Sequence, residues 1–83
     1  MIADPPSGDL ERPRTLMWEA KAAPDRGDEL VAWVLAHAAT GQVYRAAERV
    51  VLVVDLADGV PPPEPPAELV ARAPHAWRFR RVR

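Results

Sequence analysis

Trp33 and His37, a tryptophan and a histidine four residues apart, are the pair in this sequence whose types and spacing could do chemistry. On a helix this spacing places both side chains on one face. Imidazole titrates near neutrality, so His37 beside an indole could act as a general base at the wall of an aromatic pocket. The alternative is structural: Trp33 covers the edge of a sheet, and His37 is a partly exposed neighbour near the helix end, where its cation favours the dipole.

Further aromatic residues fall on expected strands, so several could converge on one sheet face: Trp18, Tyr44, Trp77 and Phe79. Large aromatic side chains dominate cores, interfaces and binding centres. A core or dimer interface is one use for them, and a pocket for a flat aromatic ligand is the other. For the pocket we predict stacking walls and two proton donors or acceptors: the walls are Trp18, Trp33 and Trp77, and the candidate catalytic residues are His37 and Tyr44.

Other site chemistries find little support. The two histidines, His37 and His75, could be joined by Asp55 in a metal site, but no HxH or HxxxH spacing supports one. Ser7 is the only serine, there is no cysteine, and the four glycines are too widely spaced for a phosphate-binding loop. We therefore expect no metal ion and no cofactor.

The C-terminal stretch from Trp77 to Arg83 alternates aromatic residues with arginines, as do strands that bind single-stranded nucleic acid. The stretch contains no lysine, and eleven basic residues nearly balance twelve acidic ones over the chain. We expect a solvated edge strand and no nucleic-acid partner, with the arginines pairing with acidic residues of the same or another subunit, namely Asp55, Asp58 or Glu68.

The elements that must position these residues begin with a strand over 14–21, where Leu16, Trp18 and Ala20 alternate with other residues. Pro24 and Asp25 then mark a helix start, with Asp25 accepting the backbone N–H of Asp28. The helix should run over 26–39, because apolar residues recur there at spacings of three and four, and Gly41 should end it.

Two strands follow, over 43–46 and 49–56, joined in a tight hairpin around Ala47 and Glu48. The second strand is apolar on both faces, so it belongs in the middle of a sheet with both sides covered. Five prolines make 59–66 a stiff, extended connection. A short helix over 67–72 and a half-buried strand over 76–82 complete the pattern.

The order β-α-β-β-α-β predicts a ferredoxin-like α+β fold, with an antiparallel four-stranded sheet in the spatial order 4-1-3-2. The strand TLMWEAKA, the helix start PDRGDEL and the hairpin VYRAAERVVLVVDL resemble the dimeric α/β-barrel proteins related to antibiotic-biosynthesis monooxygenases. The resemblance covers 14–56, and 67–82 more loosely. It implies a homodimer whose sheets pack face to face, and in some relatives cofactor-free oxidation of polycyclic aromatic substrates. The haem-degrading relatives use an asparagine, which this chain lacks.

We therefore expect a tail over 1–13 and one domain over 14–83. Without cysteine, so small a core favours self-association. No apolar stretch reaches the ~20 residues that cross a bilayer, and the N-terminus lacks the charge of a signal peptide, so we expect a soluble cytoplasmic protein without membrane contact. The expected function is binding of a small aromatic metabolite, extending to cofactor-free monooxygenation in a biosynthetic pathway. The alternative is a non-catalytic homodimeric module for protein interaction or regulation.

Overall fold

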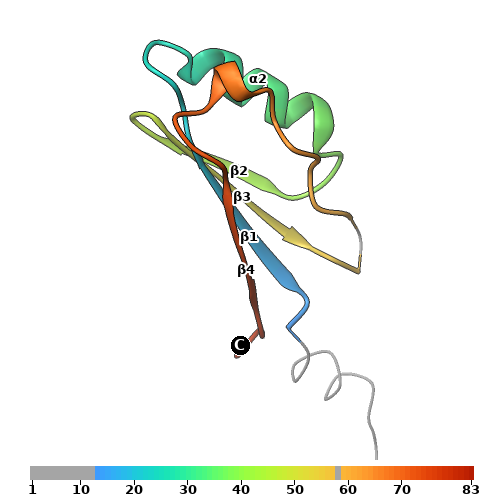
Figure 1. Ribbon diagram of the computed structural model, residues 1–83. Helices are drawn as coiled ribbons and strands as arrows, with labels where there is room; N and C mark the ends of the chain where they lie inside the picture. Colours follow the sequence, from blue (N-terminus) through green and yellow to red (C-terminus); the bar gives the residue numbers. More distant parts are fainter. Residues whose placement is uncertain (1–12, 58) are drawn as a thin grey trace, which may run out of the picture.

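The computed structural model describes residues 13–57 and 59–83, so the predicted tail lies outside the described residues except for Pro13. One helix packs on one face of a four-stranded sheet (Figure 1). The elements in chain order are β1 (Thr15–Lys21), α2 (Gly27–His37), β2 (Gln42–Ala46), β3 (Arg49–Asp55), the 3-10 turn η1 (Ala67–Leu69) and β4 (His75–Phe79).

The sheet has the order β2-β3-β1-β4, and every pairing in it is antiparallel. This confirms the predicted strand order and the central position of the two most apolar strands, β1 and β3. The fold is thus α+β with an open antiparallel sheet, an arrangement compatible with the ferredoxin-like fold.

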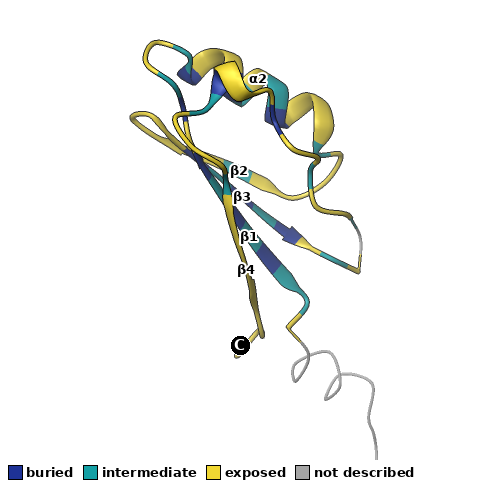
Figure 2. Cartoon of the chain, in the orientation of Figure 1, coloured by how far each residue is buried: buried dark blue, intermediate teal, exposed yellow. Residues whose placement is uncertain are grey.

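The core lies between the sheet and α2, where alternate residues of the central strands are buried (Figure 2). Leu30 and Val34, one turn apart on α2, are fully buried against them. The strands contribute Leu16, Trp18, Ala20, Val50, Leu52 and Val54. The apolar residues that recur every second position in the strands therefore pack against those that recur every three to four positions in the helix, in one apolar layer.

The helix begins one residue later than predicted, and Asp25 does not cap it. Asp25 has a φ of 63° within a turn that the Arg26 N–H closes by donating to the Ala23 carbonyl at 2.9 Å. Arg26 occupies the N-cap position without a side-chain hydrogen bond to the helix. Asp25 is thus used for the turn, because a short polar side chain tolerates this left-handed conformation.

Gly41 follows the helix in the turn that leads into β2, as expected of a glycine near a helix end. Its φ is 101°, and an added Cβ would lie 2.6 Å from the carbonyl oxygen of Val53. Both the backbone conformation and the contact with β3 therefore require glycine here.

The hairpin joins β2 and β3 through Ala47 and Glu48, as predicted. Ala47 adopts a φ of 54°, which is unfavourable for a residue with a Cβ. Arg45 Nε donates to the Ala47 carbonyl at 2.9 Å and so holds the turn.

The predicted second helix over 67–72 is wrong: only the three-residue turn η1 forms. The backbone after it pairs with the end of β1 instead, in the bridge between Ala22 and Val70. The Ala71 N–H donates to Lys21 O at 2.8 Å, and Ala23 N–H donates to Leu69 O at 2.9 Å. These bonds to the sheet replace those that a helix would have made, and Pro74 leaves little length for a helix.

The second face of the sheet has no layer over it within the described residues (Figure 1). No helix in the described part of the chain has the length and apolar character needed to cross a membrane.

Candidate functional site

Three of the five predicted site residues stack in a ladder on the helix side of the sheet. Trp18 comes from β1 and points toward α2, where Trp33 and His37 lie one turn apart. The ring centroids of Trp18 and Trp33 are 6.5 Å apart with planes 26° apart, and those of Trp33 and His37 are 4.4 Å apart at 23°. Burial decreases along the ladder, from buried Trp18 through half-buried Trp33 to exposed His37.

The tautomer of His37 follows from its contact with the helix backbone. Its Nδ1 lies 2.8 Å from the carbonyl oxygen of Trp33, and because a carbonyl can only accept, Nδ1 carries the hydrogen. In the neutral ring Nε2 is then the acceptor. His37 is therefore able to take up a proton at Nε2, at the solvent end of the ladder.

Tyr44 and Trp77 do not join this ladder. Residues directly paired across an antiparallel sheet point to the same face, and both belong to rows on the side away from α2. Trp77 pairs with Met17, which pairs with Val53, and Tyr44 pairs with Val51. The outer strands β2 and β4 are three strand spacings apart, about 14 Å. The predicted residues thus divide between two faces, and His37 and Tyr44 do not form one pocket within this chain.

The face away from α2, called the open face below, carries large aromatic side chains at both edges. The exposed fractions are 45% for Trp77, 47% for Phe79 and 57% for Tyr44. His75 also lies on it, with its ring centroid 5.8 Å from that of Trp77. Half-buried Met17, Val51 and Val53 form the centre. Sequence alternation had indicated a second apolar side for β3, but it did not reveal that the aromatic residues of both edge strands lie on that side.

Two surface hollows adjoin predicted residues. One, of about 250 Å³, lies between α2 and β2 and is lined by apolar Val31, Leu35 and Val43 together with Tyr44. The ion pair of Arg45 with Asp28 closes its end. The other, of about 280 Å³, lies beside Trp18 under the proline connection. The sequence analysis missed this second hollow, because prolines far along the chain form its wall.

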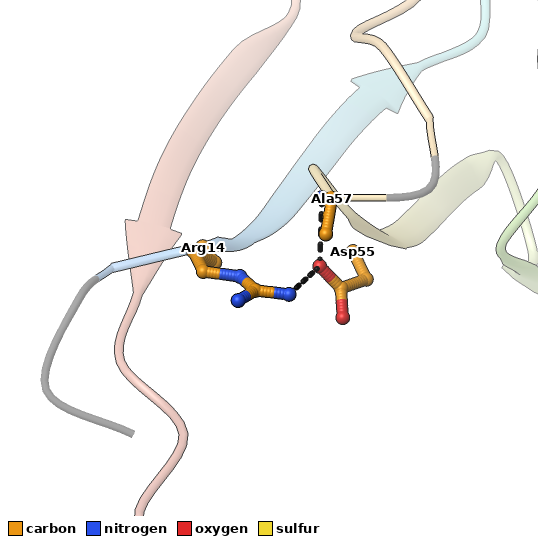
Figure 3. Close-up of polar contacts among 3 residues, drawn as sticks. All are labelled: Arg14, Asp55 and Ala57. Atoms are coloured by element: carbon orange, nitrogen blue, oxygen red, sulfur yellow. Dashed lines mark hydrogen bonds and ion pairs between the residues drawn. The ribbon is translucent and has the colours of Figure 1, made fainter. Parts of the chain in front are cut away.

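The Asp55 carboxyl group at the end of β3 has a lowered pKa because of its contacts (Figure 3). The Ala57 N–H donates to its Oδ1 at 2.9 Å, and this bond is the main reason that the pKa lies below the usual 3.8. Slight desolvation opposes the shift. Arg14, 3.4 Å away through Nη2, and the charge of Arg81 add to it. The carboxylate is thereby held as an anion that closes the turn after β3.

Asp55 does not meet the histidines in a metal site. His37 lies on α2 and His75 on β4, on opposite faces of the sheet. Among the described residues no three histidine, cysteine, aspartate or glutamate side chains come together in a way that could hold a metal ion.

In the part of the chain that the structure describes, the fold and these surfaces define a small α+β protein with an aromatic ladder, an uncovered sheet face and shallow hollows on the helix side. Compared with known proteins, the chain matches no family model, no curated protein and no solved structure. The resemblance to the antibiotic-biosynthesis monooxygenases therefore rests on the sequence pattern and on a compatible sheet order.

Proposed function

We propose that the chain acts as a homodimeric interaction module whose two copies pack through their open faces. The observation that carries the proposal is the exposure of Trp77, Phe79 and Tyr44 around an aliphatic centre on an uncovered sheet. Contiguous apolar patches of this kind on a small protein are typical of interaction sites. Aromatic residues are also the side chains most enriched at the centres of interfaces.

A second copy is the partner that fits this face best. A two-fold axis parallel to the strands places β4 of one copy over β2 of the other, so the aromatic edges face each other and the aliphatic centres meet. The acids of the face are already paired within the subunit, Glu19 with Arg49 at 2.6 Å and Asp55 with Arg14. Association therefore buries neither Glu19 nor Asp55 as an unpaired carboxylate.

The size of the face indicates a reversible dimer. Four strands about 4.8 Å apart, with about five residues each at 3.3 Å, give a flat footprint of roughly 300 Å² per copy. This is below the roughly 800 Å² per partner of a standard specific interface, so we expect a weak dimer. Burial of this face also adds a second apolar layer to a chain whose own core is small.

Light scattering coupled to size exclusion tests the dimer over a range of micromolar concentrations. The wild type should approach twice its 9.2 kDa mass as concentration rises. Val53→Asp should remain monomeric but folded, because an aspartate buried at the interface costs several kcal/mol. Trp77→Ser should also remain monomeric but folded, because it removes a large aromatic side chain from the interface. Leu35→Ser, at an exposed apolar residue on the opposite side, is the matched control and should dimerise like the wild type. A wild type that stays monomeric at the highest concentration would sink the proposal.

The second candidate function is binding of a small aromatic metabolite on the helix side. It is favoured by the hollow beside Trp18, whose indole is held in the stack with Trp33. His37 does not line this hollow, so cofactor-free oxidation with His37 Nε2 as the base would require a ligand that extends from the hollow past Trp33 to His37. Tyr44 would serve only a ligand bound at the other hollow.

A panel of flat aromatic compounds tests this candidate through quenching of tryptophan emission. Saturable quenching at one ligand per subunit supports binding, and oxygen consumption with the best binder then tests for oxidation. His37→Gln should abolish consumption and leave binding intact. If no compound gives saturable quenching, the interaction module remains as the function.

A further inference from the structure

The hollow beside Trp18 has a wall of unusual chemistry. It lies on the helix side of the sheet between the proline connection and β4, and Trp18, Ala73 and Ala76 contribute apolar surface to it. Among the described residues of the lining, five prolines supply most of the rest, and Glu64 is the only one that is charged.

The volume and flat walls suit a planar ring system. A buried apolar cavity of about 150 Å³ accommodates benzene, so about 280 Å³ has room for a two-ring molecule. Proline rings and alanine methyl groups offer flat apolar contacts. Trp18 is 5% exposed and fixed by its stack with Trp33, so its indole is a rigid part of the wall.

The polar groups of the wall favour a cation over an anion. Proline has no backbone N–H, so the five prolines present carbonyl acceptors but no donors. Glu64 adds a carboxylate, which also only accepts when ionised. A ligand that donates hydrogen bonds and carries positive charge therefore finds partners here, and an indole nearby favours a cation further. An anionic ligand finds no donor among the prolines and Glu64, and the Trp18 indole N–H is the only side-chain donor of the described lining.

We propose that this hollow binds a planar aromatic molecule that carries an ammonium group, with its rings against the Trp18 and proline wall and its ammonium at Glu64. The proposal rests on the aromatic-ligand function above and specifies the class of ligand. An aromatic anion is the competing class, because Arg72 lines the adjoining hollow on the other side of Glu64 and Pro65.

Three probes with one ring system separate these classes at pH 7: 2-naphthylmethylamine as the cation, 2-naphthylmethanol as the neutral compound and 2-naphthoate as the anion. Calorimetry gives each affinity, and the indole N–H resonance of Trp18 reports the place of binding. The cation should bind one per subunit, about five- to tenfold more tightly than the neutral probe, as expected of a partly exposed charge contact. It should also shift the Trp18 resonance.

Two variants and one control locate the contacts. Glu64→Gln should lower the affinity for the cation until it equals the affinity for the neutral probe. The affinity for the neutral probe should not change. Ala76→Leu fills the hollow and should weaken both probes, and Ala73→Leu serves the same purpose if Ala76→Leu does not fold. Glu68→Gln removes a nearby carboxylate that does not line this hollow, so it should leave all affinities unchanged.

The outcomes distinguish this inference from the function on which it rests. If the neutral probe or the anion binds as tightly as the cation, the ammonium inference is wrong but aromatic binding stands. If binding survives both leucine variants, the ligand lies elsewhere and the assignment of this hollow fails. If none of the probes binds, the inference and the aromatic-ligand function fail together.

Discussion

At the scale of single residues, Asp55 shows how an exposed carboxylate is held in its charged form. The N–H of Ala57 donates to it directly, and Arg14 approaches from the start of β1. Such groups bind their proton less readily in the folded than in the unfolded chain, so folding stability depends on pH through them.

Asp55→Asn should therefore lower stability at neutral pH by more than it does in acid. The folded-state pKa is below 3.8, so the contribution is fully present above that value and is lost as pH falls through the folded-state pKa. Urea unfolding of wild type and variant between pH 6 and pH 2 measures the difference, which should narrow as pH falls. If the stability difference between wild type and variant stays constant or widens as pH falls, the lowered pKa of Asp55 is contradicted.

His37 illustrates a residue whose role the spacing alone left open. The structure confirms that it lies on one helix face with Trp33 and stacks on that ring. Its exposure suits either a base at the surface or a residue near the negative end of the helix. The oxygen-consumption test with His37→Gln separates the two.

At the scale of elements, the hairpin between β2 and β3 contains an identifiable local strain. Ala47 has a positive φ, a conformation that costs a residue with a Cβ about 1 kcal/mol or more relative to glycine. The hairpin forms nonetheless, because β3 pairs with β1 on one side and with β2 on the other, and these pairings outweigh the cost at Ala47.

Ala47→Gly should consequently raise the free energy of unfolding by about 0.5–1 kcal/mol, the net of relieved strain and a more flexible unfolded chain. Chemical denaturation gives the value. Ala36→Gly is the matched control, because the same change at an exposed position inside α2 should lower stability by about 1 kcal/mol. Destabilisation by both changes would mean that the turn is not strained.

At the scale of the whole molecule, two surfaces of different character lie on the two sides of one sheet. Charge is also segregated along the chain: residues 71–83 carry five arginines and no acid, so the preceding part carries six basic and twelve acidic residues. The core on the helix side can be filled by a single chain. The open face has no second layer within the described residues, and in the proposed dimer another copy supplies it.

If dimer and fold are coupled in this way, the melting temperature should rise with protein concentration, because association stabilises the folded state by mass action. Calorimetry from about ten micromolar to about one millimolar measures the shift. Val53→Asp should remove the dependence and leave a folded monomer, whereas Leu52→Asp, at a fully buried core residue, should unfold the chain. If Val53→Asp and Leu52→Asp both unfold the chain, or both leave it folded, Val53 and Leu52 do not lie on different faces of β3.

Strand alternation and helical spacing are local properties of the chain, so the residues alone were enough to predict β1, α2, the β2–β3 hairpin, β4 and their order in the sheet. The helix predicted over 67–72 failed for a non-local reason, since backbone bonds to Lys21 and Ala23, about fifty residues earlier, replace its own. In the candidate site, by contrast, a local property was enough. The spacing of Trp33 and His37 predicted their contact, because one turn of helix separates them.

The register of strands far apart in sequence decided which face of the sheet each remaining aromatic residue occupies. A shift of one residue in the pairing of β4 with β1 would move Trp77 from the open face to the core. The register seen here separates Trp77 and Tyr44 from Trp18 and brings the proline connection over Trp18. Composition and periodicity thus specify the layers of this protein, whereas long-range pairing alone determines what its surfaces present to a partner or a ligand.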